Sequence, residues 1–551
     1  MPTLSWLTRE KDVKRADGVA YRLLERDDAL SVGDAQSGNM LIQGDNLEAL
    51  KSLLPYYRGQ VKCIYIDPPY NIDAAVGDMF DDNFAHAQWL GIMWPRLGLL
   101  EQLLADDGLL ICSIDDKEGA YLTVILDEIF GRTNRINTVA VKMSEASGVK
   151  MAHADKRLPK LKEWLIVYGK SNRPKFEIDL LPPERWNEEY KTLLVGLTRD
   201  EIDTIKSKMA IETASLEDIQ ECQAILAKSK LVSLSKYFKE HDVADDEIDN
   251  WRFENAWRIV QAVGSGSVYN LAQRSKKSGG EISSALSSTG IVYLFKSEIN
   301  LDAKSPRIQI IFADQNLMTH PGDFWTDIKT TGGVGKEGGV HFPNSKKPER
   351  LIQRVIGLCT KEGDLVLDSF LGSGTTAAVA HKMGRRWIGI EMGDHAVSHC
   401  APRMSKVIDG EQGGISQSVG WQGGGGFAFY RLGAAVFDGD GAINPGIAFT
   451  PLAAHVWFSE TGVPFAGVAD TPFLGNHDGR GLALLYNGIL GDKRVSGGNV
   501  LTRKTLAVIR AAAVGFAGPI IVYGEASRLS PETLKAEGIT FKQTPYDVRA
   551  R

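Results

Sequence analysis

Residues 61–71 read Val-Lys-Cys-Ile-Tyr-Ile-Asp-Pro-Pro-Tyr-Asn, and the fold can be predicted outward from them. The apolar run 61–66 predicts a buried strand. The two prolines that follow cannot donate to a sheet ladder, so the chain must leave the sheet after Asp67. The motif therefore places a carboxylate, a rigid carbonyl and the Tyr70 ring at the carboxyl end of a strand, where open α/β sheets bind ligands.

A flat base with an exocyclic amino group suits this motif. Asp67 and the carbonyl oxygen of Pro68 can accept the amino hydrogens, and the ring of Tyr70 can stack on the base. The predicted catalytic residues are Asp67, Pro68, Pro69 and Tyr70. An ordinary turn at the end of a strand is the alternative interpretation. The adjoining Asn71 and a second motif downstream favour a catalytic role for this motif over an ordinary turn.

The second motif occupies residues 365–391 and predicts a strand, a glycine loop, a helix and a second strand. Gly372 and Gly374 let the backbone pass close to a ligand at the start of the helix. Glu391 ends the second strand, near the spacing at which an acid binds ribose hydroxyls in dinucleotide folds. Ala377 stands in place of the third dinucleotide glycine, so another nucleoside-bearing cofactor is favoured.

Together the two motifs resemble those of β-class amino-methyltransferases that act on DNA, in particular the modification subunits of type III restriction systems. In that family Asp-Pro-Pro-Tyr is catalytic, and Phe-x-Gly-x-Gly, here residues 370–374, binds S-adenosylmethionine. The resemblance covers about residues 35–430, with the motifs in the family's order. It implies a Rossmann-like α/β methyltransferase sheet with an inserted target-recognition domain. Because Asp rather than Ser precedes Pro-Pro-Tyr, it implies an adenine-specific DNA methyltransferase.

The resemblance also names further cofactor contacts. Asp45 follows a short predicted strand and can cap the next helix. Similar enzymes use this acid on the cofactor's adenine, and the resemblance favours that role. Lys346 and Pro348 are candidate contacts beside the methionine moiety, the alternative being a proline-started helix. The predicted cofactor-binding residues are Asp45, Asp368, Phe370, Gly372, Ser373, Gly374, Thr375, Thr376 and Glu391.

The composition is that of a soluble multidomain protein. The 551 residues suit about two to four domains, and 43% apolar residues allow large cores. The five cysteines are scattered without metal-ligand spacing, so reduced thiols in a cytoplasm and no metal are predicted. No apolar run has the length of a membrane span and no signal-peptide pattern is present, so no membrane association is predicted.

Composition shifts and the extent of the family resemblance divide the chain into five segments. They are a lead-in (1–35), the catalytic half of a methyltransferase domain (36–175), a target-recognition domain (176–335), the cofactor-binding half (336–431) and a C-terminal α/β interaction domain (432–551). The target-recognition role rests on the resemblance, since the family places that domain between the two motifs. Thr198-Arg199-Asp200-Glu201 within it predicts a capped helix.

Net charge is −6, so a DNA surface must be a local patch. Residues 142–175 hold nine Lys and Arg against three Asp and Glu, which favours a loop that contacts phosphates over a solvated charged face. Asp115 and Asp116 follow another predicted strand, 108–114, and a helix cap is favoured there over a metal site.

The predicted partners are double-stranded DNA, a second copy of the chain through residues 432–551, and a restriction subunit or another defence protein. Cytosine exocyclic-amine methylation, RNA methylation and a catalytically idle DNA-binding assembly subunit are the alternatives. The intact Asp67, Tyr70, Gly372 and Gly374 count against the idle subunit.

Overall fold

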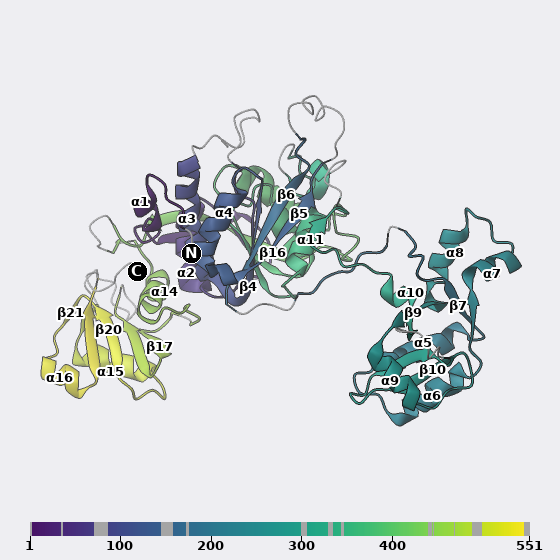
Figure 1. Ribbon diagram of the computed structural model, residues 1–551. Coiled ribbons are helices and arrows are strands. Elements are labelled where there is room, and N and C mark those ends of the chain that lie inside the picture. The colour runs from purple at the N-terminus through teal and green to yellow at the C-terminus, as the bar shows by residue number, and fades with distance from the viewer. Residues whose placement is uncertain are drawn as a thin grey trace. The chain divides into compact units, whose positions relative to one another are not determined.

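The computed structural model describes two compact units. The large unit comprises Met1–Ile178 and Gly322–Arg551, and the inserted unit comprises Asp179–Pro321 (Figure 1). The described residues are 3–34, 37–70, 86–144, 158–171, 176–183, 185–298, 306–328, 334–342, 346–438, 443–444, 446–467, 469–486 and 499–544. None of the helices in these ranges has the length and apolar content that a membrane span requires.

A mostly parallel sheet forms the centre of the large unit. Its described strands, in spatial order, are β1 (Arg22–Gly33), β16 (Gly426–Ala435), β2 (Met40–Gln43), β15 (Arg386–Glu391), β14 (Leu365–Asp368), β3 (Val61–Ile66), β4 (Leu104–Ile114), β6 (Lys162–Gly169), β5 (Arg135–Lys142) and β13 (Phe324–Trp325). Strands β16 through β4 run parallel, whereas β1 and β6 pair antiparallel with their neighbours. The fold is therefore the α/β sheet that the two motifs predict.

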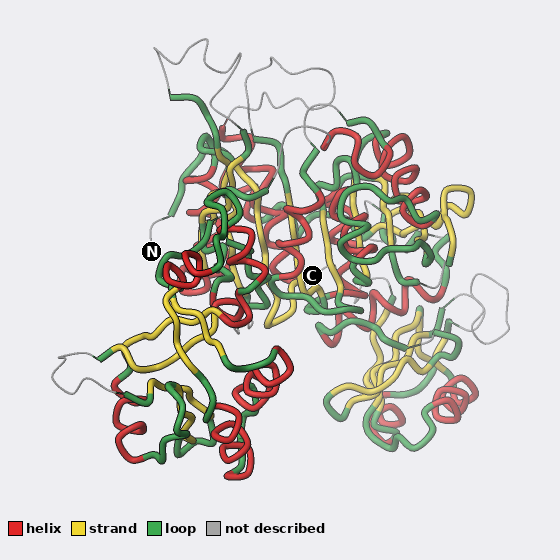
Figure 2. The backbone as a smooth tube through the Cα atoms, turned by 90° about the vertical axis from the view of Figure 1, so that its right-hand side faces the viewer, coloured by secondary structure: helices red, strands yellow, loops and turns green. Residues whose placement is uncertain are grey.

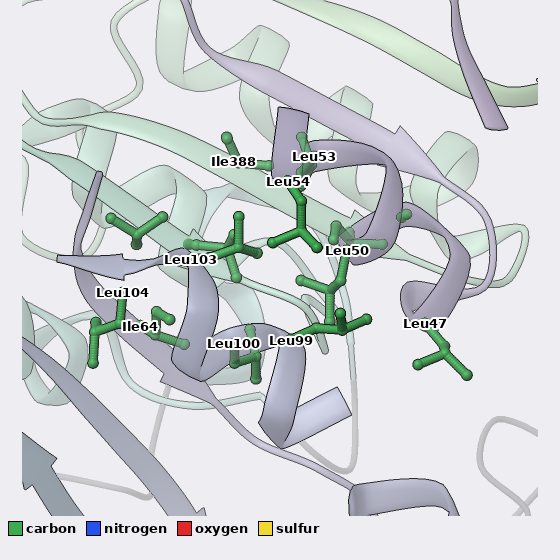
Figure 3. Packing of buried hydrophobic residues seen from close by; sticks show 14 of the residues in the cluster. Leu47, Leu50, Leu53, Leu54, Ile64, Leu99, Leu100, Leu103, Leu104 and Ile388 are labelled. Carbon is green, nitrogen blue, oxygen red and sulfur yellow. The ribbon is translucent and has the colours of Figure 1, made fainter. Parts of the chain in front are cut away.

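Helices cover both faces of this sheet because its buried residues alternate between two cores. Ile64 and Ile66 join the core under α2 (Asn46–Tyr57), α3 (His86–Leu103) and α4 (Gly119–Leu126). Cys63 and Tyr65 join the core under α11 (Glu349–Gly357), α12 (Thr375–Lys382) and α13 (Ala401–Ile408). Figure 3 shows the first core, where leucines of α2 and α3 pack around Ile64 and Ile388. Burial on both faces explains why these strands read as continuous apolar runs.

The two motifs meet at a topological switch point. Strands β3 and β14 are parallel neighbours, with Leu367 beside Ile64. From β3 the chain crosses through α3 to β4 on one side, and from β14 through α12 to β15 on the other. The helices α3 and α12 cover opposite faces. The carboxyl ends of β3 and β14 therefore flank the crevice where open α/β sheets bind ligands.

The inserted unit has a sheet of its own (Figure 2). It also has hydrophobic cores of its own. Its described strands, in spatial order, are β10 (Ile282–Leu286), β11 (Val292–Lys296), β12 (Arg307–Phe312), β9 (Ile259–Gly264), β7 (Thr192–Val195) and β8 (Lys230–Ser233). Its helices are α5 (Arg199–Met209), α6 (Leu216–Leu226), α7 (Leu234–Glu240), α8 (Ile248–Glu254), α9 (Gly266–Arg274) and α10 (Ala313–Asn316). The predicted capping box is confirmed, since Thr198 and Glu201 exchange hydrogen bonds at the start of α5.

Residues beyond β16 add a second, smaller sheet to the large unit. Its strands are β17 (Phe473–His477), β18 (Arg480–Leu484), β20 (Ile520–Gly524) and β22 (Ile539–Gln543), beside the pair β19 (Val500–Leu501) and β21 (Ala526–Ser527). The helices are α14 (Phe449–Thr461), α15 (Arg503–Ala512) and α16 (Pro531–Ala536). Leu452 and Val456 of α14 join the α2 core, and the Phe465 amide donates to the Pro55 carbonyl (2.9 Å).

Three observed boundaries differ from those the composition predicts. Residues 1–35 contain α1 (Arg9–Val13) and also β1, which pairs with β16 as an edge of the central sheet. The predicted boundary at 431 falls inside β16. β13 pairs with β5, which assigns residues 322–328 to the large unit rather than the insertion. These pairings join segments far apart in the chain, so local composition carries no signal of them.

Candidate active site

The Asp-Pro-Pro-Tyr turn is held against helix α3. The chain leaves the sheet after Ile66, the last residue of β3, as the prolines require. The buried indole of Trp89 on α3 donates to the Pro69 carbonyl (2.7 Å). This bond fixes the turn so that Asp67 and Tyr70 face the carboxyl end of the sheet. Asn71 and residues 73–84 lie outside the described residues.

The Tyr70 hydroxyl is the centre of a polar cluster. It donates to Asp67 Oδ1 (2.6 Å) and lies 2.8 Å from Ser113 Oγ on β4. Lys347 Nζ donates to the Tyr70 hydroxyl (2.8 Å) and to Glu163 Oε2 on β6 (2.7 Å), and lies 3.2 Å from Asp67 Oδ1. The predicted catalytic residues are thus joined by a second carboxylate and an ammonium.

Burial and charge act in opposite directions on this cluster. Burial raises the pKa of Asp67, and Lys347 offsets only part of that rise. Burial also opposes the charges on Lys347 and Glu163, but their attraction prevails, so the pKa of Lys347 is raised and that of Glu163 is lowered. Lys347 and Glu163 are therefore the ionised pair, and Asp67 is the carboxyl that holds a proton most readily.

The glycine loop after β14 is closed by Asp368. Its Oδ1 accepts from the Phe370 amide (2.9 Å) and its Oδ2 accepts from the Thr376 hydroxyl (2.6 Å). Burial raises the pKa of Asp368 to about 7. Through these bonds Asp368 and Thr376 hold the loop in its observed conformation. Direct contact of either residue with a cofactor stays a prediction.

Gly372 and Gly374 both have left-handed backbone, with φ of +56° and +80°. A Cβ built on Gly372 would meet no atom within 4 Å, so this part of the loop faces open space. Glu391 Oε2 at the end of β15 accepts from the Gly372 amide (2.8 Å). The structure therefore brings Gly372 and Glu391 together, as the spacing predicts, on the accessible side of the loop.

A buried charge cluster that includes Arg403 of α13 holds the glycine loop in place. Arg403 on α13 donates to the Thr375 hydroxyl (2.7 Å) and to the Ser373 carbonyl (3.2 Å). Glu349 accepts from Arg403 (2.8 Å) and from Lys382 (2.8 Å), and the side chains of all three are fully buried. Ser373 and Thr375 are buried too, so their predicted contact with a cofactor would be through the loop backbone.

Asp45 takes the helix-capping position. Its Oδ1 accepts from the Leu47 amide at the start of α2 (2.7 Å), and its Oδ2 pairs with Arg96 (3.0 Å). About 39% of the Asp45 side chain is exposed, and a carboxylate has lone pairs for further donors. The cap is therefore observed, and the contact with a cofactor adenine stays a prediction.

The crevice fits the cofactor that the resemblance implies. Burial raises the pKa of Asp67, Asp368 and Glu391, so a bound cation would favour their ionised forms. S-adenosylmethionine carries a sulfonium and an ammonium. The Ser369 hydroxyl is buried at the start of the loop with no partner among the described residues, and Met392 after β15 is 69% exposed. The loop thus offers a polar group and an apolar surface for a nucleoside.

Other predicted residues make different contacts. Lys346 Nζ donates to the Val340 carbonyl (2.9 Å), and burial lowers its pKa to about 8. Pro348 precedes the first residue of α11 as the alternative predicts. The predicted cap is observed at Asp115, whose Oδ1 accepts from the Lys117 amide (2.9 Å) in the turn that leads into α4 and whose Oδ2 pairs with Lys160 (2.7 Å). Asp116 instead pairs with Lys162 (2.7 Å).

Sequence reasoning missed three residues of the polar cluster: Ser113, Glu163 and Lys347. Glu163 is the second residue of β6, between Lys162 and an apolar run, which is a weak signal of a functional acid. Lys347 precedes Pro348, but nothing in its spacing connects it with Asp67. Within the described ranges, no group of His, Cys, Asp and Glu could hold a metal ion. All five cysteines are free and buried.

The sequence is similar to those of known proteins. Residues 61–401 match the family described as DNA methylase. The probable type III restriction-modification enzyme HindVI Mod subunit of Haemophilus influenzae is 36% identical over 417 residues, covering 72% of this chain and 54% of the relative. The type III EcoPI Mod subunit of Escherichia phage P1 is 27% identical over 388 residues, covering 63% of this chain and 55% of the relative.

A type II methyltransferase, M.KpnI of Klebsiella pneumoniae, is 26% identical over 363 residues and covers 64% of this chain and 78% of that protein. The chain spans about half the length of the Mod subunits it matches. The family match alone covers more than half of the 551 residues. With a Rossmann-like sheet that brings both motifs to one crevice, the chain belongs to the DNA methylase family.

Proposed function

We propose that this protein is a site-specific DNA methyltransferase. It transfers a methyl group from S-adenosylmethionine to the exocyclic amine of an adenine in double-stranded DNA, in a cytoplasmic restriction-modification or phage-defence setting. One observation carries the proposal: β3 and β14 are adjacent and parallel, so Asp67 and the glycine loop lie at one crevice. The relatives' designation as Mod subunits supports the setting.

The chain's own groups prepare the amine for attack. An amino group inside a duplex is out of reach, so the base must flip into the crevice. Asp67 and the Pro68 carbonyl accept the amino hydrogens and turn the nitrogen lone pair towards the donor. The ionised Asp67 also stabilises the positive charge that develops on nitrogen. Bound S-adenosylmethionine supplies a methyl group already activated on sulfonium, so positioning at attack distance provides much of the rate gain.

The product distinguishes adenine from the alternatives. Purified protein is incubated with S-adenosylmethionine and duplex DNA, and the digested nucleosides are identified by mass spectrometry. We expect N6-methyladenine. Methylation of the cytosine amine would instead indicate a cytosine-specific DNA methyltransferase, and methylation of RNA alone would indicate an RNA methyltransferase. No methylation of any substrate would favour a catalytically idle assembly subunit.

The glycine loop gives a test of cofactor binding. Gly372→Val places a branched side chain in the open space beside Glu391, and Glu391→Gln removes a carboxylate from the crevice. Each variant is expected to weaken S-adenosylmethionine binding by about tenfold or more, equivalent to about 1.4 kcal/mol, in calorimetry.

Gly363→Val is the matched control. Gly363 also has positive φ (+83°) with no atom within 4 Å of a built Cβ, but it precedes the opposite end of β14. The Gly363→Val variant reproduces the backbone strain without filling the crevice. Its affinity for S-adenosylmethionine should therefore equal that of the wild type. Unchanged affinity in both test variants would remove the loop from the cofactor site.

The inserted unit is the proposed target-recognition domain. It has its own sheet and cores, which supports exchange as an intact module. Replacing residues 179–321 with the corresponding segment of a relative that methylates another site should transfer that relative's sequence specificity. Sequencing of methylated bases measures the outcome. A folded chimera that keeps the recipient's site would contradict the assignment.

We further propose a homodimer that pairs through residues 432–551, with a restriction subunit as an additional partner. The exposed Val508 and Val514 (39% and 90% exposed) support an interface on this region. Truncation at 431 is a poor test because it cuts β16 and uncovers α2. Light scattering should instead show a dimer that Val508→Asp/Val514→Asp weakens, and a monomeric wild type would end the proposal.

A further inference from the structure

We propose that Lys347 and Glu163 are positioning residues for methyl transfer: Glu163 anchors the Lys347 ammonium, which favours the ionised form of Asp67 and turns one of its oxygens towards the target amine. This inference rests on the proposed function and deepens it. Neither residue belongs to the Asp-Pro-Pro-Tyr or glycine-loop motif. Lys347 precedes α11, whereas Glu163 lies on β6, on the far side of β3 and β4 from β14.

The Lys347 ammonium contacts three oxygens, two of them through hydrogen bonds. These are Glu163 Oε2 (2.7 Å), the Tyr70 hydroxyl (2.8 Å) and Asp67 Oδ1 (3.2 Å). The Lys347 side chain is only 11% exposed, so water competes weakly for these bonds. A buried ammonium that donates two hydrogen bonds and contacts a third oxygen as an ion pair is held in one orientation and holds its acceptors in turn.

The two oxygens of Asp67 have different surroundings. Tyr70 and Lys347 both contact Oδ1. Oδ2 accepts no hydrogen bond from any residue in the part of the chain that the structure describes, and the Asp67 side chain retains 20% exposure. The cluster therefore occupies one oxygen and leaves the other for the amino hydrogen of the flipped base.

Charge explains why the ammonium of Lys347 is needed. Asp67 and Glu163 share one buried site, and two neighbouring carboxylates cannot both ionise without a cation. A protonated Asp67 would present a donor where the amine needs an acceptor. The other ionisable groups facing the site are Tyr65, Asp368 and Lys160. Lys160 already pairs with Asp115 (2.7 Å), so among the described residues Lys347 is the cation that contacts Asp67.

The test measures single-turnover methylation against pH in the full-length protein saturated with S-adenosylmethionine and duplex DNA. In Lys347→Met the acidic limb of the profile should move up by about 1–3 pH units, since an adjacent opposite charge lowers a carboxyl pKa by about that much. In Lys347→Met/Glu163→Leu the limb should return towards the wild type, because the competing carboxylate is gone. Calorimetry with S-adenosylmethionine should show similar affinities in all variants.

Arg354→Met is the matched control. Arg354 lies on α11 and forms a similarly buried ion pair, with Asp327 (2.6 Å), that does not contact Asp67. Its loss should lower stability without moving the acidic limb. A wild type that methylates no nucleic acid would refute the proposed function itself, before any variant is compared.

Urea unfolding against pH provides a readout that needs no activity. In Lys347→Met one carboxyl pKa in the folded state rises further above its unfolded value. A carboxyl whose pKa is raised on folding stabilises the folded state fully at a pH below its pKa in the unfolded chain, about 4. This stabilisation is lost as the pH rises through the pKa of the carboxyl in the folded protein. The variant should therefore lose stability relative to the wild type between about pH 5 and 8.

Three results would overturn the inference. The first is an acidic limb that stays in place in Lys347→Met. The second is a double variant whose limb moves as far as that of Lys347→Met, which would leave Glu163 without a role. The third is a large loss of cofactor affinity with an unmoved limb, which would assign Lys347 to the cofactor instead.

Discussion

Asp67→Ala is expected to lower the single-turnover rate of DNA methylation by at least about 10²–10³-fold, the effect of removing one transition-state hydrogen-bonding group. The variant loses the acceptor for the amino hydrogens and the charge that stabilises the developing cation. Binding of S-adenosylmethionine should stay nearly unchanged, because the proposed cofactor contacts come mainly from residues after β14 and β15. Methyl transfer from radiolabelled cofactor and calorimetry measure the two quantities.

Asp116→Ala is a suitable control for this variant. Asp116 also follows the carboxyl end of a strand of the same sheet, but it is exposed and pairs with Lys162 on the surface. Its loss should change the rate by less than about tenfold, since exposed ion pairs contribute about 0–1 kcal/mol. An Asp67→Ala rate within tenfold of the wild type would remove Asp67 from the mechanism.

Glu349→Gln is expected to destabilise the large unit by about 3–5 kcal/mol, the cost of breaking a buried ion pair by removing one partner. Glu349 is the acid between Lys382 and Arg403, and all three side chains have 0% exposure. Lys382 keeps Glu411 as a partner, but Arg403 is left without a carboxylate among the described residues. Hydrogen exchange of the α12 amides measures this loss without requiring the whole chain to unfold in one step.

Asp28→Asn provides the comparison in the same unit. Asp28 pairs with Arg26 on β1, and its side chain is 82% exposed, so the change should stay within about 0.5 kcal/mol. Because Arg403 also holds Ser373 and Thr375, Glu349→Gln should weaken S-adenosylmethionine binding as well. Exchange rates in α12 equal to those of the wild type would show that the cluster does not stabilise the glycine loop.

The sequence by itself determined the parts of this protein that local chemistry controls. Apolar runs predicted β3 and β14 as buried strands because each strand is covered on both faces. Two prolines required the chain to leave the sheet after Asp67, and two glycines with positive φ allowed the loop after Asp368. The order of these signals along the chain was enough to predict the sheet and the reaction class.

Tertiary structure decided which charges meet. Lys347 reaches Asp67 and Glu163 only because β3, β6 and the start of α11 converge at one end of the sheet. The pairing of β1 (Arg22–Gly33) with β16 (Gly426–Ala435) joins segments far apart in the chain in the same way. Hydrophobic periodicity indicates that a residue is buried but not which residue from a distant part of the chain lies beside it. The energy of an ion pair depends on the distance between its two charges, which periodicity does not give. The sequence was therefore enough to predict Asp67 as a site residue but not to predict the residues that contact it.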